Sequence, residues 1–215
     1  MQHSYRRLFI ALGAENCSGK SSVAAKLTEG HGFHHYSVRS FIQKRFRKEY
    51  GKDPDELRDI YTTFSISQKQ KYGAHTFIQD IVDDFLDSHH RICVCESIRS
   101  IGEVQWLHNL NTHLGQPVWY AFVMLTADKD QRRERFKKRP DSLALELTDE
   151  EFERQEVLSN SGLESWSENI GSLKRYAHLT VKNNDGMLDE AVQQFLAYAE
   201  KILGPPKKKS TVITY

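Results

Sequence analysis

The sequence has few of the features that mark secreted, membrane or nucleic-acid-binding proteins. Three cysteines among 215 residues are too few for a disulfide scaffold, which favours a reducing, cytoplasmic setting. No apolar run approaches the ~20 residues that cross a bilayer, and the first residues lack the layout of a signal peptide. Because 30 basic residues nearly balance 29 acidic ones, we expect neither a nucleic-acid polymer nor an anionic membrane as partner.

The length of the chain suits one medium-sized domain that buries its own core. We predict this domain over residues 1–204. Residues 205–215 open with two prolines and three lysines, so we expect a basic, disordered tail. A solvated tail is the favoured interpretation, and a localisation or docking signal is the alternative.

Short apolar runs alternate with amphipathic segments along the chain. Alternation of this kind predicts a three-layer α/β domain, in which helices cover both faces of a five-stranded parallel sheet. Ligands bind beyond the carboxyl ends of the strands in such sheets, so we look for chemistry in the loops that follow them. The expected strands are 8–12, 33–37, 92–95, 117–125 and 177–181. The expected helices begin near 20, 40, 53, 104, 128, 148 and 187, with a break at Gly73 in the third.

The first strand is followed by a loop close to the pattern G-x-x-x-x-G-K-S/T. Backbone N–H groups of such a loop, and of the helix that follows it, converge on a polyphosphate. Lys20 is placed to reach the β- and γ-phosphates, and the Ser21 hydroxyl to hold Mg²⁺. One departure is that Ala14 stands where the pattern has its first glycine, which would restrict the backbone if a positive φ were needed there. The predicted nucleotide-binding residues here are Gly13, Ala14, Asn16, Cys17, Ser18, Gly19, Lys20, Ser21 and Ser22.

A very basic segment, 128–139, follows the fourth strand. Asp128 and Gln131 are typical of a helix cap, and Arg132, Arg135 and Arg139 fall on one helical face. Guanidinium groups beside a triphosphate stabilise the charge on a phosphoryl group in transfer. A solvated basic face is the alternative interpretation, and the neighbouring phosphate loop favours the functional one.

This order of phosphate loop, strand and arginine-rich helix resembles the nucleoside-monophosphate-kinase group of P-loop kinases. It is most similar to the adenylate-kinase-like and dephospho-CoA-kinase-like branch, and the stretch VCESIRSIGEV at 94–104 also looks like segments of that branch. The resemblance spans about 7–203 and implies the P-loop NTPase fold with a helical lid, over about 139–165, that closes on ATP.

The resemblance also implies roles for individual residues. Arg132 and Arg135 would contact the nucleotide phosphates as catalytic groups, and Arg139 and Arg154 would belong to the lid. The loop after the last strand would pack near the nucleobase, which points to Asn183, Asn184 and Gly186.

An acidic residue, Glu96, ends the third strand. A carboxylate there is able to hold a Mg²⁺-bound water or to accept the proton of an attacking hydroxyl, so we assign Glu96 a catalytic and metal-binding role with Lys20 and Ser21. A helix cap or salt-bridge acid is the alternative. Arg39 and Arg99 are candidates to clamp an acceptor phosphate, and an exposed helix-start position is equally open for Arg39. The helical segment 39–73 would form the acceptor-side wall.

These observations lead us to expect a cytoplasmic phosphotransferase that uses ATP and Mg²⁺. Dephospho-CoA and deoxynucleoside kinases carry an acid just after the second strand, whereas 35–39 here reads HYSVR. This favours an acceptor that already bears phosphate, most simply a nucleoside monophosphate. A hydroxyl acceptor, such as dephospho-CoA or a nucleoside, and a nucleotide-sensing protein with little transfer activity stay open. A homodimer is possible.

The histidines and cysteines do not indicate a zinc site. His34, His35, His89 and His90 lack partners at zinc-like spacing, so we expect exposed histidines. Cys93 and Cys95 should face one side of a buried strand. Cys17 lies near a helix N-terminus, where its thiol would be acidified.

Overall fold

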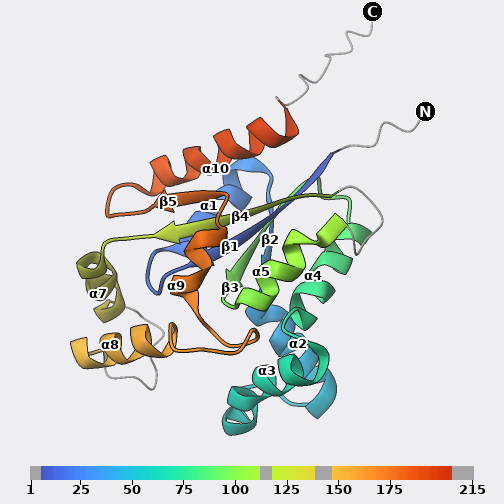
Figure 1. The fold of residues 1–215 in the computed structure, drawn as a ribbon, viewed down its shortest axis with the longest axis vertical. Coiled ribbons are helices and arrows are strands. Elements are labelled where there is room, and N and C mark those ends of the chain that lie inside the picture. The colour runs from blue at the N-terminus through green and yellow to red at the C-terminus, as the bar shows by residue number, and fades with distance from the viewer. Residues whose placement is uncertain (1–5, 112–117, 139–146, 205–215) are drawn as a thin grey trace, which may run out of the picture.

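The computed structural model of the chain describes residues 6–111, 118–138 and 147–204. Five strands form one parallel sheet in the order β2-β3-β1-β4-β5 (Figure 1). Their bounds are β1 Arg7–Ala14, β2 His34–Ser37, β3 Ile92–Ile98, β4 Val118–Thr126 and β5 Leu179–Lys182. Since β1 lies at the centre, the loop that follows it opens in the middle of the carboxyl edge.

Helices cover both faces of the sheet, which confirms the predicted three-layer arrangement. Leu8, Ile10 and Leu12 of β1 pack towards α1 (Lys20–His31) and α10 (Leu188–Leu203). Phe9 and Ala11 point the other way, because side chains alternate along a strand. That second face is covered by α2 (Val38–Tyr50), α4 (Thr76–Asp87), α5 (Ile101–His108) and α9 (Ile170–Leu173) (Figure 1).

Two helical regions lie outside these layers. One is α3 (Arg58–Tyr72), which packs beside α2 and α4. The other comprises α7 (Lys129–Lys137) and α8 (Asp149–Leu158), which lie beyond the end of β4 (Figure 1). A short 3-10 helix, η1 (Lys174–Tyr176), precedes β5. No helix among the described residues is long and apolar enough to cross a membrane. Arg139, the first part of the predicted lid and the predicted tail lie outside the described residues.

The predicted helix start, with Asp53 as the cap and Pro54 as the first helical residue, is wrong by four residues. The Asp53 N–H donates to Glu56 Oε1 at 3.0 Å, which is half of a capping box, but residues 54–57 form only a turn and α3 begins at Arg58. The Asp53 carboxylate, which would cap the helix, is instead paired with Arg47 of α2. The predicted break at Gly73 is confirmed, because α3 ends at Tyr72 and Gly73 has a φ of 98°.

Gly13, where β1 leads into the phosphate loop, is required by packing. A Cβ built on Gly13 would lie 2.6 Å from Phe122 Cζ of β4 and 3.2 Å from Met124 Sδ. Ala14 is not among the residues with positive φ; Cys17 and Ser97 are the non-glycine residues with that conformation in the described ranges. The missing first glycine of the motif therefore imposes no backbone strain.

We predict that Gly13→Ala lowers the free energy of unfolding by about 1–3 kcal/mol, because the added methyl overpacks the core against Phe122. Urea unfolding measures the effect. The control is Gly30→Ala in α1, where a Cβ meets nothing within 4 Å and helix propensity should raise stability by about 0.5–1 kcal/mol. A Gly13→Ala variant as stable as the wild type would contradict this account.

Candidate phosphate-binding site

The carboxyl edge of the sheet brings together residues from separate parts of the chain. Ser21, in the first turn of α1, donates a hydrogen bond from Oγ to Glu96 Oε2 at 3.0 Å. Glu96 comes from β3, which pairs directly with β1. The predicted metal-binding pair is therefore adjacent in space. Two depressions lie elsewhere, one between α1 and α10 and one around Arg7 and His90, and neither contains these groups.

A bulge in β3 sets the position of Glu96. Leu12 pairs with Glu96, but the next residue, Gly13, pairs with Ile98, so Ser97 is the extra residue. Ser97 has a φ of 77°, a left-handed conformation that costs a non-glycine residue about 1–3 kcal/mol. Bulges re-aim side chains and occur often beside functional sites. In this structure the residue before the bulge, Glu96, meets the Ser21 hydroxyl.

The surroundings of Glu96 keep it ionised although it is only 7% exposed. Burial raises the pKa of this carboxyl, but the neighbouring His35, the Lys20 charge and the Ser21 hydroxyl more than offset burial, so the pKa of Glu96 lies below its ordinary value. His35 Nε2 lies 3.5 Å from Glu96 Oε1, too far for a good hydrogen bond.

His35 is a residue that sequence reasoning missed. The prediction that His34 and His35 are exposed is wrong, because both are half-buried. His35 Nε2 is buried without a hydrogen-bond partner. The histidine reaches Glu96 only because β2 pairs with β3, two strands that are far apart in the sequence.

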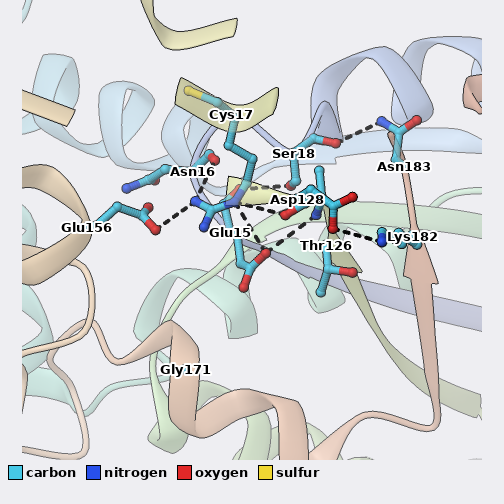
Figure 2. A network of polar contacts seen from close by, with 12 residues as sticks. Glu15, Asn16, Cys17, Ser18, Thr126, Asp128, Glu156, Gly171, Lys182 and Asn183 are labelled. Carbon is cyan, nitrogen blue, oxygen red and sulfur yellow. Dashed lines mark hydrogen bonds and ion pairs between the residues drawn. The ribbon is translucent and has the colours of Figure 1, made fainter. Parts of the chain in front are cut away.

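The carbonyl groups of the phosphate loop are bound from one side by side chains of other elements. Arg132 Nη1 donates to Asn16 O at 3.3 Å, and Arg135 Nη1 donates to Cys17 O at 3.4 Å. Asn183 Nδ2 donates to Ser18 O at 2.7 Å (Figure 2). In a trans peptide the C=O and N–H groups point in opposite directions. The amides of Cys17 and Gly19 are therefore turned away from these side chains, as phosphate binding requires.

Two further features shape the same loop. The Ser18 N–H donates back to Glu15 O at 3.2 Å, which closes a tight turn. Gly19 has a φ of 87°, and a Cβ there would lie 2.5 Å from Asn183 Nδ2. Glycine is thus required at this position both by backbone conformation and by the close approach of Asn183.

The predicted phosphate-binding arginines contact protein groups here. The Arg132 side chain is 6% exposed and lies 2.7 Å from Glu156 Oε2 and 3.4 Å from Glu15 Oε2. Arg135 pairs with Asp185 at 2.7 Å. A direct role of either arginine in transfer stays a prediction. Arg154, on the exposed side of α8, pairs with Glu151 at 2.6 Å.

The predicted nucleobase loop is joined to α7. Asn184 Oδ1 accepts the Asp128 N–H at 3.0 Å, and Asn184 Nδ2 donates to Asp128 Oδ2 at 2.6 Å. Lys182 pairs with the same carboxylate at 2.7 Å. Asp128 is the N-cap residue of α7, as predicted, but its side chain makes no capping hydrogen bond. The Asp128 carboxylate is bound by this loop instead, and the Gln131 side chain accepts the Asp185 N–H.

The two candidate acceptor-binding arginines lie on the β2 and β3 side of the edge. Arg39 is exposed at the start of α2. Arg99 Nη1 pairs with Glu168 Oε2 at 2.6 Å. The Arg99 N–H donates to Glu103 Oε2 at 2.9 Å. Glu103 closes a full capping box with Ser100 at the start of α5, so this part of the edge is rigidly organised.

Comparison with known proteins shows the fold class. No family model and no curated protein matches this chain. A Thermus thermophilus protein of known structure superposes with a TM-score of 0.59 at 15% identity, over 93% of this chain and 100% of that one. A shikimate kinase from Bacteroides thetaiotaomicron superposes with a TM-score of 0.52 at 13% identity, over 90% of this chain and 98% of that one. A sugar kinase from a Janibacter species superposes with a TM-score of 0.50 at 11% identity, over 91% of this chain and 95% of that one.

This chain therefore has the P-loop NTPase fold, as predicted. Its donor set also fits Mg²⁺ with a nucleotide. Ser21 Oγ and the ionised Glu96 are oxygen donors of the kind Mg²⁺ prefers, and Mg²⁺ is usually held by one or two such groups together with waters and substrate phosphates. No cluster of three His, Cys, Asp or Glu suited to a metal occurs in the part of the chain that the structure describes.

We predict that iodoacetamide at mildly alkaline pH labels Cys17 of the folded protein and spares Cys93 and Cys95. Burial raises the pKa of the Cys93 and Cys95 thiols well above their ordinary value, and both side chains face the same core, as expected. Cys17 is only half-buried. Peptide mapping measures the labelling, and all three thiols should react in urea. Equal labelling of the three in the folded state would contradict the packing described.

Proposed function

We propose that the protein is an ATP- and Mg²⁺-dependent phosphotransferase that moves the γ-phosphoryl group to a nucleoside monophosphate. The observation that carries this proposal is the contact of 3.0 Å between Ser21 Oγ and the buried Glu96 carboxylate, beside a loop whose amides face away from its side-chain supports. The fold, shared with proteins named as kinases, supports the same reaction class.

The residues of the loop would act by binding and orienting the triphosphate. The loop amides and Lys20 would hold the β- and γ-phosphates, while Ser21 and Glu96 would hold the metal, Glu96 through a water. When bound, Mg·ATP supplies the phosphoryl group and the metal neutralises negative charge on it. Catalysis on this proposal comes mainly from positioning and electrostatic stabilisation.

The acceptor site would lie on the β2 and β3 side of the edge. Arg99 is paired with Glu168, which is exposed enough for an acceptor phosphate to replace it. Arg39 is exposed at the start of α2. The wall formed by α2 and α3 is attached to this edge, because Lys69 of α3 pairs with the buried Glu103 at 2.7 Å. An acceptor phosphate is already anionic and needs no strong base.

One observation favours a second candidate, a kinase for a hydroxyl acceptor. His35 Nε2 faces Glu96 Oε1 at 3.5 Å and is buried without a hydrogen-bond partner. A carboxylate–imidazole pair at this point is suited to remove the proton from a hydroxyl as it attacks. The acceptor decides between the two candidates.

We predict that Lys20→Ala lowers the transfer rate on the order of 100-fold or more, because it removes a charge that contacts the transferred group. The matched control is Lys26→Ala on the same helix, where Lys26 pairs with Asp189 and lies outside the site. Steady-state ADP release measures both variants, and circular dichroism checks their folding. Near-normal turnover of Lys20→Ala would refute the assignment, and tight ATP binding without acceptor-stimulated ADP release would favour a sensing protein.

A panel of nucleoside monophosphates, nucleosides and dephospho-CoA should identify the acceptor. With a monophosphate we expect Arg99→Ala to raise the acceptor KM and His35→Ala to leave kcat near normal, since no base is needed. With a hydroxyl acceptor, His35→Ala should lower kcat by about 10²–10⁴-fold. Turnover of hydroxyl acceptors alone would overturn the monophosphate proposal and leave the kinase assignment standing.

A further inference from the structure

A buried cation, the Arg132 guanidinium, occupies the rear of the phosphate loop. Its Nε donates to Ala127 O at 3.1 Å and its Nη1 to Asn16 O at 3.3 Å. Two carboxylates flank it: Glu15 from the loop and Glu156 from α8. Figure 2 draws this network, with Glu156 and Asn183 approaching the loop from opposite ends.

We propose that Arg132 is a positioning residue that sets the peptide orientation of the phosphate loop, and that Glu156 holds it in place. The placement of α8 then determines whether the loop is ready for a triphosphate. This proposal rests on the proposed function, because it assigns the loop a nucleotide to bind.

The contacts of Arg132 depend on the planar shape of its guanidinium group. The single N–H of Nε donates to Ala127 O, with Glu15 Oε2 3.4 Å from the same nitrogen, and Nη1 contacts both Asn16 O and Glu156 Oε2. A lysine ammonium is a point charge that cannot span these acceptors in a fixed plane. Without the cation, the Glu15 and Glu156 carboxylates would repel each other next to the loop.

A second set of contacts joins the same loop residues to the α8–η1 region. Asn16 Nδ2 donates to Ser159 Oγ at 3.3 Å, just after α8. Glu15 Oε1 pairs with Lys174 of η1 at 2.7 Å. The Ser159 carbonyl in turn accepts the Ile170 N–H of α9 at 3.1 Å. Glu15 and Asn16 therefore contact Arg132 of α7, the residue that follows α8, and η1.

These contacts couple two equilibria. If Glu156 contacts Arg132 only when α8 is docked as in this structure, the docked state favours the loop conformation in which the loop amides point towards a phosphate. By linkage, a triphosphate that selects this loop conformation must stabilise the docking of α8 by the same free energy. The coupling requires no contact between α8 and the nucleotide.

The test compares Arg132→Lys and Glu156→Gln with the control Arg133→Lys. Arg133 is the next residue on α7 and pairs with Glu153 at 2.9 Å, away from the loop. Five quantities are measured on the full chain: urea stability, the ATP Kd by calorimetry, kcat, the acceptor KM, and amide hydrogen exchange of residues 15–19.

We expect Arg132→Lys and Glu156→Gln to raise the ATP Kd and lower kcat by a combined factor of about 100, to leave the acceptor KM unchanged, and to speed exchange in the loop. The double variant Arg132→Lys/Glu156→Gln should be little worse than Arg132→Lys alone, because on this proposal Glu156 acts on the loop only through Arg132. Arg133→Lys should match the wild type in the loop.

Folded Arg132→Lys and Glu156→Gln proteins with wild-type ATP affinity and unchanged loop exchange would overturn the proposal. If Arg132→Lys fails to fold, the isosteric Glu156→Gln decides in the same way. A wild type that binds no nucleoside triphosphate refutes the proposed function instead. In that case, amide exchange of the loop tests the role of Arg132 separately. Faster exchange in the variants supports the proposal that Arg132 positions the loop, and unchanged exchange overturns it.

Discussion

The orientation of a few peptide groups between β1 and α1 is the constraint on which the rest of the site depends. A loop of amides attracts a polyphosphate only if its carbonyls point elsewhere, and carbonyls buried without donors would be costly. Arg132, Arg135 and Asn183 supply those donors from α7 and from the loop after β5. The elements behind the loop are therefore part of the candidate phosphate site.

The carboxyl edge of the sheet also contains strain of its own. Ser97 adopts a left-handed conformation in the bulge that follows Glu96. The Glu96 carboxylate accepts a hydrogen bond from Ser21 of α1. Such strain persists only where surrounding packing over-determines it. Here β1 and β2 pair with β3 on either side, and the capping box of α5 follows directly.

The two helical regions outside the layers are attached to this edge in the same manner. Lys69 connects α3 to the buried Glu103 of α5, and Glu156 connects α8 to the buried Arg132 of α7. Removal of one partner from such a buried pair typically costs about 3–5 kcal/mol. In each pair, the buried partner also binds backbone groups at the carboxyl edge. Glu103 completes the capping box of α5, and Arg132 donates to a carbonyl of the loop.

Local pattern alone determined the five strands, the longer helices, the phosphate loop and the candidate metal pair Ser21 and Glu96, because apolar periodicity and loop motifs depend on neighbours in the chain. It did not predict the short helices α9 and η1. Only the tertiary structure decided that His35 faces Glu96, that Gly13 is needed for Phe122, and that Arg132 lies behind the loop between two carboxylates. Each of these contacts joins residues distant in sequence, and strand order and helix docking set which distant residues meet. A single sequence carries no direct record of that choice.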